Sequence, residues 1–404
     1  MTINPITRRA WRTGLLALCL AVCGPALAQV TVRPELLKPL QAAQEALNAR
    51  QHQQALDQLG PLLATPSLTP AELGVMLRLQ AVAALGMSQW DLAITTLQRL
   101  LSTPEVSATD RRAFQESLMN AAQQKKDYPL LIQTARQYLQ EGGSNPSIRP
   151  ALIQSLALTE RHAELVEALQ EKIRLDTAAG QKTAESHLRL LAVSHRQLKD
   201  EAGYNATLRL LLASYPKPEY WAEAIARLIA APGFNNRYEL DAFRLLEQTG
   251  NLQTAVDFVE MAGVALRVGL PAEALRVLRQ GFEKGVLGQG AEAAAHNRLR
   301  AEAEAKVRED DKGFAQLEKS ARDGNTLASV ADVHASRQDW AQAQAVYARA
   351  LAAGGLRREQ EVRLHQAISL FRGGDKAAAQ QALKGIEGDA TAVEIAGLWA
   401  LLMR

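Results

Sequence analysis

Cysteine is almost absent from this chain, and aromatic residues are few. The only two cysteines in 404 residues are Cys19 and Cys23, and both lie in an N-terminal segment that we expect to be removed. A chain that begins at Gln29 can therefore form no disulfide, no thiolate metal site and no cysteine nucleophile. Phe, Trp and Tyr together make up only 5% of the residues. The remaining composition, rich in Ala, Leu, Gln, Glu and Arg, favours helices.

A secretory signal peptide is predicted at the N-terminus. Arg8, Arg9 and Arg12 precede a short apolar run, which is followed by an Ala-Leu-Ala sequence that ends at Ala28. This order of charge, apolar core and small residues predicts cleavage after Ala28 and export to the periplasm. The arginine pair faintly resembles a twin-arginine signal, and Cys23 would be the lipidated residue of a lipoprotein. The residue before Cys23 is a valine rather than a small residue, so we do not expect a lipid anchor.

Excess charge and long apolar runs are also lacking. The three arginines of the signal peptide carry the formal net charge of +3, so the chain from Gln29 onward is neutral. This balance argues against general binding of nucleic acids. After the signal peptide no apolar run approaches the ~20 residues that cross a membrane, so we expect no transmembrane segment.

A helical hairpin pattern recurs along the rest of the chain. One position of each second helix, most often Ala, repeats at intervals of 34 to 39 residues, and two intervals are twice as long. A period in this range predicts a solenoid of stacked hairpins. The repeated positions are Ala55, Ala93, Leu131, Leu165, Tyr204, Ala274, Ala343 and Ala379.

The clearest repeats resemble the tetratricopeptide repeat (TPR). In one of them a short turn at Asp339 and Trp340 is followed by Ala343, Tyr347 and Ala350, the order of small and aromatic residues that this repeat has in its second helix. We therefore predict an all-α fold, a right-handed α-solenoid of about ten TPR-like helical hairpins over residues 29–404. The clearest repeats lie near residues 73–104, 255–285, 325–355 and 358–387.

Three parts of the chain depart from the regular repeat. The two long intervals, centred near Leu240 and Ala315, each predict a degenerate helical pair, where we expect the superhelix to change curvature. In the second interval the charged run 308–311 is predicted to end a helix. Pro61 is expected to kink or split the second helix of the first repeat. The apolar segment 390–403 is predicted to be a C-terminal capping helix.

Three segments outside the repeat positions resemble a family of exported TPR proteins of Gram-negative bacteria. These segments are 32–35, which reads VRPE, 215–221, which reads YPKPEYW, and 285–293. The resemblance implies a protein that is not an enzyme and that acts as a periplasmic scaffold for protein–protein interaction. It also implies a place in an envelope assembly, such as one for TonB-type energy transduction.

The alternative is an enzyme that acts on peptidoglycan, such as a lytic transglycosylase, or its helical accessory. Those enzymes use a Glu-Ser pair, and the chain contains Glu116-Ser117 and Glu185-Ser186. Neither pair is followed by a lysozyme-like domain, and the seven histidines do not have the spacing of a zinc site. The sequence therefore predicts no catalytic residue, no cofactor and no metal site.

The partner is expected to be a protein or peptide that lies along the concave face, which the first helix of each hairpin would form. Amides and cations on that face could bind a peptide backbone and anionic groups, although a solvated helix surface is the alternative for these residues. The candidate residues are Asn120, Gln123, Gln124, Gln154, Arg189 and Arg196.

Overall fold

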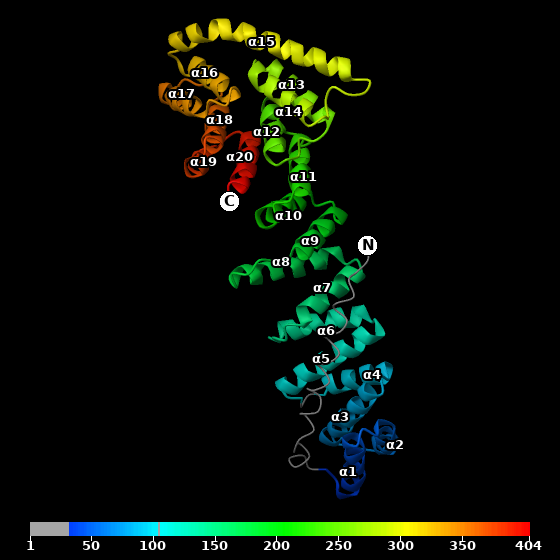
Figure 1. The fold of residues 1–404 in the computed structure, drawn as a ribbon. Coiled ribbons are helices and arrows are strands. Elements are labelled where there is room, and N and C mark those ends of the chain that lie inside the picture. The colour runs from blue at the N-terminus through cyan, green and yellow to red at the C-terminus, as the bar shows by residue number, and fades with distance from the viewer. Residues whose placement is uncertain (1–31, 104–105) are drawn as a thin grey trace. The chain divides into compact units, whose positions relative to one another are not determined.

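The computed structural model describes residues 32–103 and 106–404, so the predicted signal peptide lies outside the described residues. The described residues form twenty α-helices, one short 3₁₀ helix and no strand (Figure 1). The chain divides into two compact units, an N-terminal unit that ends at Gln181 and a C-terminal unit that begins at Lys182. The predicted all-α solenoid of TPR-like hairpins is confirmed, with nine helical pairs in the described part of the chain.

The N-terminal unit contains four hairpins, and each of its helices contacts the next. Their boundaries are α1 (Pro34–Asn48), α2 (His52–Leu63), α3 (Pro70–Gly86), α4 (Trp90–Leu101), α5 (Ala108–Lys125), α6 (Tyr128–Gln140), α7 (Ile148–Leu158) and α8 (His162–Ala178). Helix α2 continues through Pro61 and ends two residues later, so the predicted split of this helix is wrong. Pro61 removes only its own hydrogen bond to the carbonyl four residues earlier, and only two residues of the helix follow it.

The C-terminal unit contains five hairpins and two further helices. Its first six helices are α9 (Glu185–Gln197), α10 (Glu201–Ser214), α11 (Pro218–Ile229), α12 (Glu239–Gln248), α13 (Ala255–Arg267) and α14 (Pro271–Glu283), with the 3₁₀ helix η4 (Asn236–Tyr238) before α12. The remaining helices are α15 (Ala293–Ser320), α16 (Gly324–Ser336), α17 (Trp340–Ala353), α18 (Glu359–Arg372), α19 (Lys376–Leu383) and α20 (Ala390–Leu402). The pair α11 and α12 confirms the helical pair predicted near Leu240.

Eight hairpins share one turn geometry. In each, the residue two positions before the second helix has a positive φ, and only two of these eight residues are glycine. The amide of that residue and the next amide both bond back to carbonyls at the end of the first helix; in one hairpin Gln338 donates to Ala335 and Asp339 to His334. This is a Schellman-type helix end. The residues with positive φ are Arg50, Ser88, Lys126, Glu160, Lys199, Gly269, Gln338 and Gly374.

This turn fixes the position of the repeated small residue. Each of the eight repeated positions is the fourth residue of its second helix, and each is buried. Five are alanines with no exposed surface, including Ala274 and Ala343, which allow the paired helices to approach closely. The largest is Tyr204, whose hydroxyl reaches out of the hairpin and donates to Glu223 Oε1 at 2.5 Å.

Gln338→Gly is expected to raise the free energy of unfolding by about 0.5–1 kcal/mol, because a residue with a Cβ atom is strained at positive φ and glycine is not. Gln338 is exposed and has a φ of 64°. Urea denaturation followed by circular dichroism measures the change. The control is Ala348→Gly at an exposed position inside α17, where glycine is expected to cost about 1 kcal/mol. Equal losses at both positions would contradict the prediction.

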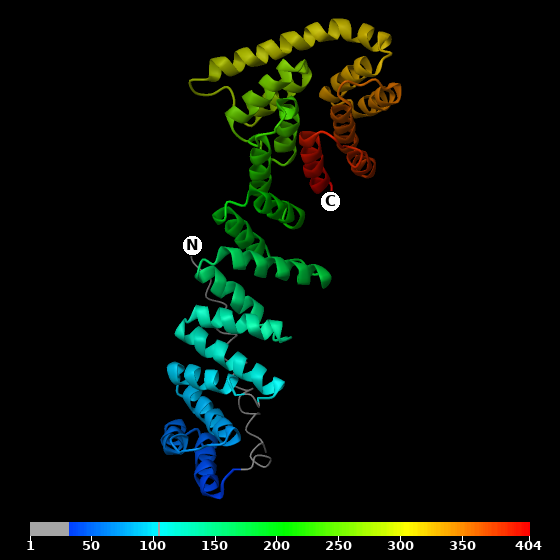
Figure 2. The same ribbon diagram turned by 180° about the vertical axis from the view of Figure 1, so that it is seen from behind.

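The C-terminal unit folds back on itself. Helices α9 to α14 form a first arm, α15 crosses from this arm to α16, and α16 to α20 form a second arm that runs back beside the first (Figures 1 and 2). Helix α14 contacts both α15 and α16, and α20 contacts α10 and α12 of the first arm as well as α18 and α19 of the second. The direction of the solenoid therefore reverses within this unit.

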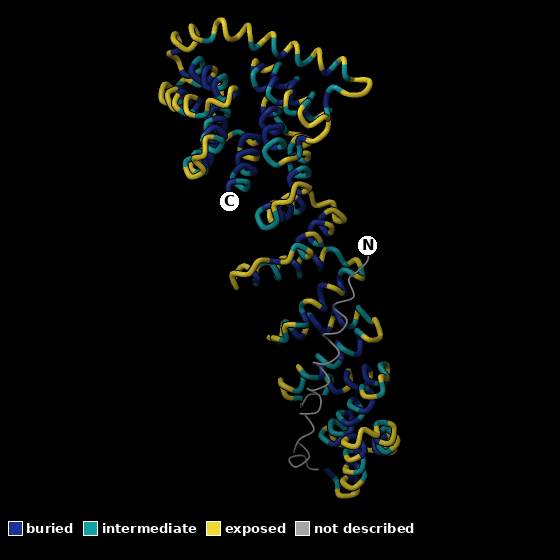
Figure 3. The backbone as a smooth tube through the Cα atoms, viewed as in Figure 1, coloured by how far each residue is buried: buried dark blue, intermediate teal, exposed yellow. Residues whose placement is uncertain are grey.

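The reversal occurs at α15, where the sequence predicted a helical pair. A single unbroken helix of 28 residues takes its place, so the predicted pair near Ala315 is wrong, and the charged run 308–311 lies inside the helix rather than at its end. The helix packs on two different cores: Leu299, Ala303 and Val307 pack on the core of α13 and α14, and Phe314 packs on the core of α16 and α17. Most of its remaining surface is exposed (Figure 3).

Candidate functional site

The predicted binding residues fall in both units. On α5, Asn120 and Gln123 are half-buried and Gln124 is exposed, and on α7 Gln154 is exposed. Helices α5 and α7 both contact α6, so the four amides belong to two successive first helices of the N-terminal unit. Arg189 and Arg196 are exposed on α9 of the C-terminal unit, where the Arg196 guanidinium lies 5.8 Å from the ring centre of Tyr204. The structure shows where these four amides and two arginines lie, and their role in binding stays a prediction.

The two glutamates of the enzyme alternative are held by other side chains. Glu116 accepts hydrogen bonds from the Tyr138 hydroxyl at 2.5 Å and from Asn145 Nδ2 at 2.9 Å. Glu185 accepts from Lys217 at 2.7 Å and from the Tyr220 hydroxyl at 2.5 Å. The hydrogen bonds from Lys217 and Tyr220 lower the pKa of Glu185. A general acid needs a raised pKa, so the environment of Glu185 is the opposite of what glycoside hydrolysis requires.

The densest polar cluster of the C-terminal unit is buried between its two arms, and the sequence pattern did not predict it. Its centre is Arg244 on α12, which is only 8% exposed. The guanidinium donates two parallel hydrogen bonds to Glu273 of α14, at 2.9 and 2.7 Å, and a third to Asp241 at 2.8 Å. A two-point pairing of this kind fixes the relative position of α12 and α14.

His365 on α18 joins this centre to the second arm. Its Nδ1 atom lies 2.7 Å from Asp332 Oδ1 of α16, and its Nε2 atom lies 3.2 Å from Asp241 Oδ1 of α12. Asp332 Oδ1 also accepts a hydrogen bond of 2.5 Å from the hydroxyl of Tyr347 on α17. The cluster therefore links helices of both arms through side chains that are more than 100 residues apart in the sequence.

A second group of charges extends the cluster along α12. Glu247 pairs with Arg276 of α14, whose Nη2 atom is 3.0 Å away, and with Arg372 of α18 at 3.1 Å. Burial alone would raise the pKa of Glu247, but the two guanidinium groups lower it. Asp241, Arg244 and Glu247 lie three residues apart and occupy one face of α12, and this face meets the second arm.

The protonation states follow from these contacts. Burial opposes the charged form of His365, yet the carboxylates of Asp241 and Asp332 raise its pKa well above the ordinary value of about 6.5. Burial likewise opposes ionisation of Asp241, and His365 and Arg244 lower its pKa. Burial and the neighbouring Asp332 carboxylate raise the pKa of Tyr347 well above its ordinary value. At neutral pH the cluster contains an imidazolium, a guanidinium and ionised carboxylates.

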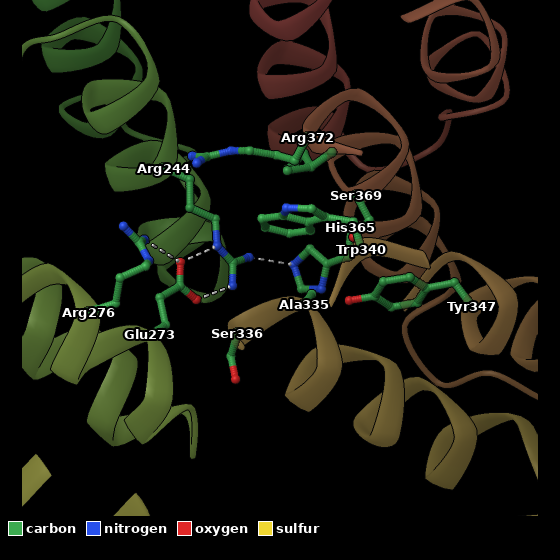
Figure 4. Close-up of a pocket in the computed structure, with 11 residues that line it drawn as sticks. Arg244, Glu273, Arg276, Ala335, Ser336, Trp340, Tyr347, His365, Ser369 and Arg372 are labelled. Carbon is green, nitrogen blue, oxygen red and sulfur yellow. Dashed lines mark hydrogen bonds and ion pairs between the residues drawn. The ribbon is translucent and has the colours of Figure 1, made fainter. Parts of the chain in front are cut away.

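A small cavity lies beside the cluster (Figure 4). Its walls include Arg244, Glu273, Trp340, His365 and Arg372, which point toward one another from both arms. Its volume of about 30 Å³ has room for one or two water molecules. Pockets that bind small molecules are typically about 300–1,000 Å³. This cavity is therefore too small for an organic substrate.

Two further kinds of site are not found in the described part of the chain. Residues 32–103 and 106–404 contain no group of three histidine, cysteine or carboxylate side chains that could hold a metal ion. Among the helices of the same residues, none combines the length and the apolar character that a membrane span needs.

Comparison with protein families finds no match, and comparison with curated proteins finds no similar sequence. Comparison with solved structures finds helical chains of low similarity. One is a chain in the structure of Naa15/Naa10 bound to HypK-THB, with 12% identity and a TM-score of 0.33; the match covers 86% of this chain and 62% of that chain. Another is yeast Tom70, with 12% identity, a TM-score of 0.25 and coverage of 90% and 87%. At this level of similarity the function must be inferred from the residues of this chain.

Proposed function

We propose that this protein is an exported scaffold that binds a protein partner along the first helices of its N-terminal unit. The observation that carries the proposal is the row of amides Asn120, Gln123, Gln124 and Gln154, which lie on two successive first helices and are exposed or half-buried. An amide side chain offers both a donor and an acceptor, so it can bond to the backbone of an extended peptide.

The proposed role is not enzymatic. Glu116 and Glu185 are both occupied by hydrogen bonds from neighbouring side chains, and the cavity between the arms has room only for water. The signal peptide predicted before Gln29 supports a periplasmic location, where the partner would belong to an envelope assembly such as a TonB-type one. N-terminal sequencing of the protein from its own cells tests the location, with Gln29 as the expected first residue.

A crosslinking experiment tests the binding surface. A photoreactive amino acid at Gln124 or Gln154 is expected to capture the partner in living cells. The control positions are Gln98 on α4 and Gln133 on α6, which are exposed glutamines on second helices of the same unit. Capture of the same protein from all four positions, or from the control positions alone, would contradict the proposed surface.

Once the partner is known, Gln124→Ala with Gln154→Ala is expected to weaken its binding about tenfold, because each lost hydrogen bond contributes about 0.5–1.5 kcal/mol. Titration calorimetry measures the change. Arg189→Glu with Arg196→Glu tests separately whether the binding surface includes α9, and Arg279→Glu with Arg349→Glu, at exposed positions of the second helices α14 and α17, is the control for the added negative charge. Unchanged binding in the amide variant would exclude the proposed surface.

A further inference from the structure

The buried cluster contributes several of the polar contacts between the two arms of the C-terminal unit. Asp241 and His365 are 124 residues apart in the sequence, and Glu247 and Arg372 are 125 residues apart. The chain between the arms runs through α15, whose two halves pack on different hydrophobic cores. The strength of the contact between α12 and α18 therefore depends on the charges of a few buried side chains.

The two carboxylates that face His365 favour its protonated form, while Arg244 Nη1 makes a longer approach of 3.4 Å to the Nε2 atom. Both ring nitrogens face carboxylates, Nδ1 at 2.7 Å from Asp332 and Nε2 at 3.2 and 3.3 Å from the two oxygens of Asp241. A neutral imidazole has one N–H group, so one carboxylate would face a ring nitrogen with a lone pair. The imidazolium has two N–H groups and satisfies both carboxylates.

We propose that His365 is a proton-dependent latch that holds the two arms of the C-terminal unit together and releases them at alkaline pH. Asp332 and His365 lie on the same arm and form the shorter contact, so the proton that remains in neutral His365 stays between them. The contact that is lost is then the one from Nε2 to Asp241, which joins the arms, and only the longer approach of Arg244 Nη1 to Nε2 remains in its place. This inference concerns the C-terminal unit alone and does not depend on the proposed partner surface.

The other charges around His365 make loss of its proton costly. Four acidic groups of the cluster, Asp241, Glu247, Glu273 and Asp332, are balanced by Arg244, Arg276, Arg372 and protonated His365 on α12, α14, α16 and α18. Deprotonation leaves one buried negative charge in excess. Tyr347 on α17 also faces the cluster, but its pKa is raised well above the ordinary value.

Glu361, one turn before His365 on α18, is the remaining titratable group at the edge of the cluster. Its Oε2 atom is buried with no hydrogen-bond partner, and the nearest cation, Arg237, is 3.8 Å from it. Burial raises the pKa of Glu361, although His365 and Arg358 counteract part of this effect. Its titration must be separated from that of His365 in any test.

The direction of the pH effect follows from the raised pKa of His365. A group whose pKa is higher in the closed form stabilises that form fully below its ordinary pKa of about 6.5, and this stabilisation is lost as the pH rises through the closed-form value. For one proton, the ratio of closed to open molecules is expected to fall up to tenfold per pH unit while the pH lies between the open-form and closed-form pKa values, and to level off above the closed-form value.

The test measures the distance between the arms in the full chain with Cys19→Ser and Cys23→Ser, which removes the native cysteines. Exposed alanines on each arm, Ala226 on α11 and Ala377 on α19, are changed to cysteine and carry spin labels. We expect one narrow distance distribution at pH 6.5 and a second, longer distance that grows at alkaline pH while the helical circular dichroism signal is retained.

Three variants connect the response to His365. His365→Gln is expected to show the longer distance at neutral pH and little further change with pH. Glu361→Gln and His334→Gln are expected to keep the wild-type response; His334 is another buried histidine of the second arm and contacts Glu318 at 2.8 Å. A distance that does not change with pH, or a response that survives in His365→Gln, would overturn the proposal.

Discussion

Arg244→Met is expected to lower the free energy of unfolding of the C-terminal unit by about 3–5 kcal/mol. The guanidinium is the shared donor for Asp241 and Glu273, which are 2% and 5% exposed. Methionine has a similar length but no charge, so the variant leaves the Glu273 carboxyl group buried with only Arg276, 3.9 Å away, as a partner. The cost comes from these uncompensated charges rather than from lost packing.

Urea denaturation followed by tryptophan fluorescence measures this loss, because Trp221, Trp340 and Trp399 all lie in the C-terminal unit. The control is Arg209→Met. Arg209 also joins the arms, through Glu394 of α20, but the two side chains are 45% and 52% exposed. An exposed ion pair contributes at most about 1 kcal/mol, so the control should be much milder. Equal losses for the two variants would show that the buried cluster contributes no more than a surface pair.

A second comparison separates charge from shape. Combining Arg244→Met with Asp241→Asn and Glu273→Gln removes both carboxylates together with their partner, so fewer buried charges remain unpaired. We expect this triple variant to be more stable than Arg244→Met alone. A triple variant that is less stable than the single one would mean that the hydrogen bonds of the remaining groups, and not their charges, determine the cost.

The repeated hairpins could be predicted from the sequence because the signal for each is local. A turn of two or three residues, a residue at positive φ and a small residue at the fourth position of the next helix all lie within six residues of one another. Ala274, Ala343 and Ala379 follow this rule in the sequence and in the structure. Even Tyr204, which departs from it in size, occupies the same buried position.

Helix α15 could not be predicted in the same way. It has Gly313 and the charged run 308–311 near its middle, and both favour a helix end in an isolated sequence. A glycine inside a helix costs only about 1 kcal/mol, which the packing of Leu299 and Val307 before the charged run and of Phe314 after it can offset. The two cores that hold this helix are formed by segments before and after it in the chain.

The buried ionic cluster was missed for a related reason. Asp241, Arg244 and Glu247 share one face of α12, and a charged helix face is ordinarily solvated. Here that face meets α18, which is more than 110 residues away in the sequence. The spacing of three residues between charges on α12, beside the apolar residues Leu240 and Phe243, was the available signal. Its partners become evident only when the reversal at α15 is known.

Trp399→Ala is expected to cost about 3–5 kcal/mol of the stability of the C-terminal unit, because it opens a large cavity in the closing helix α20. Trp399 has no exposed surface, and its ring meets Phe371 of α18 edge-on at 5.8 Å. Thermal unfolding followed by circular dichroism measures the loss. Val393→Ala in the same helix is the control, since Val393 is 41% exposed and its truncation should cost less than about 1 kcal/mol.

Trp399→Phe then tests what the indole itself contributes. The Trp399 Nε1 atom is buried and has no hydrogen-bond partner among the described residues, so its N–H group is a cost that phenylalanine removes. We therefore expect Trp399→Phe to lose clearly less stability than Trp399→Ala.

Helix α20 contacts α10 and α12 of the first arm as well as α18 and α19. If Trp399→Ala also lengthens the distance between labels at Ala226 and Ala377 at neutral pH, then α20 and the His365 cluster hold the same two arms. An unchanged distance would mean that Trp399 is not needed to keep the arms closed.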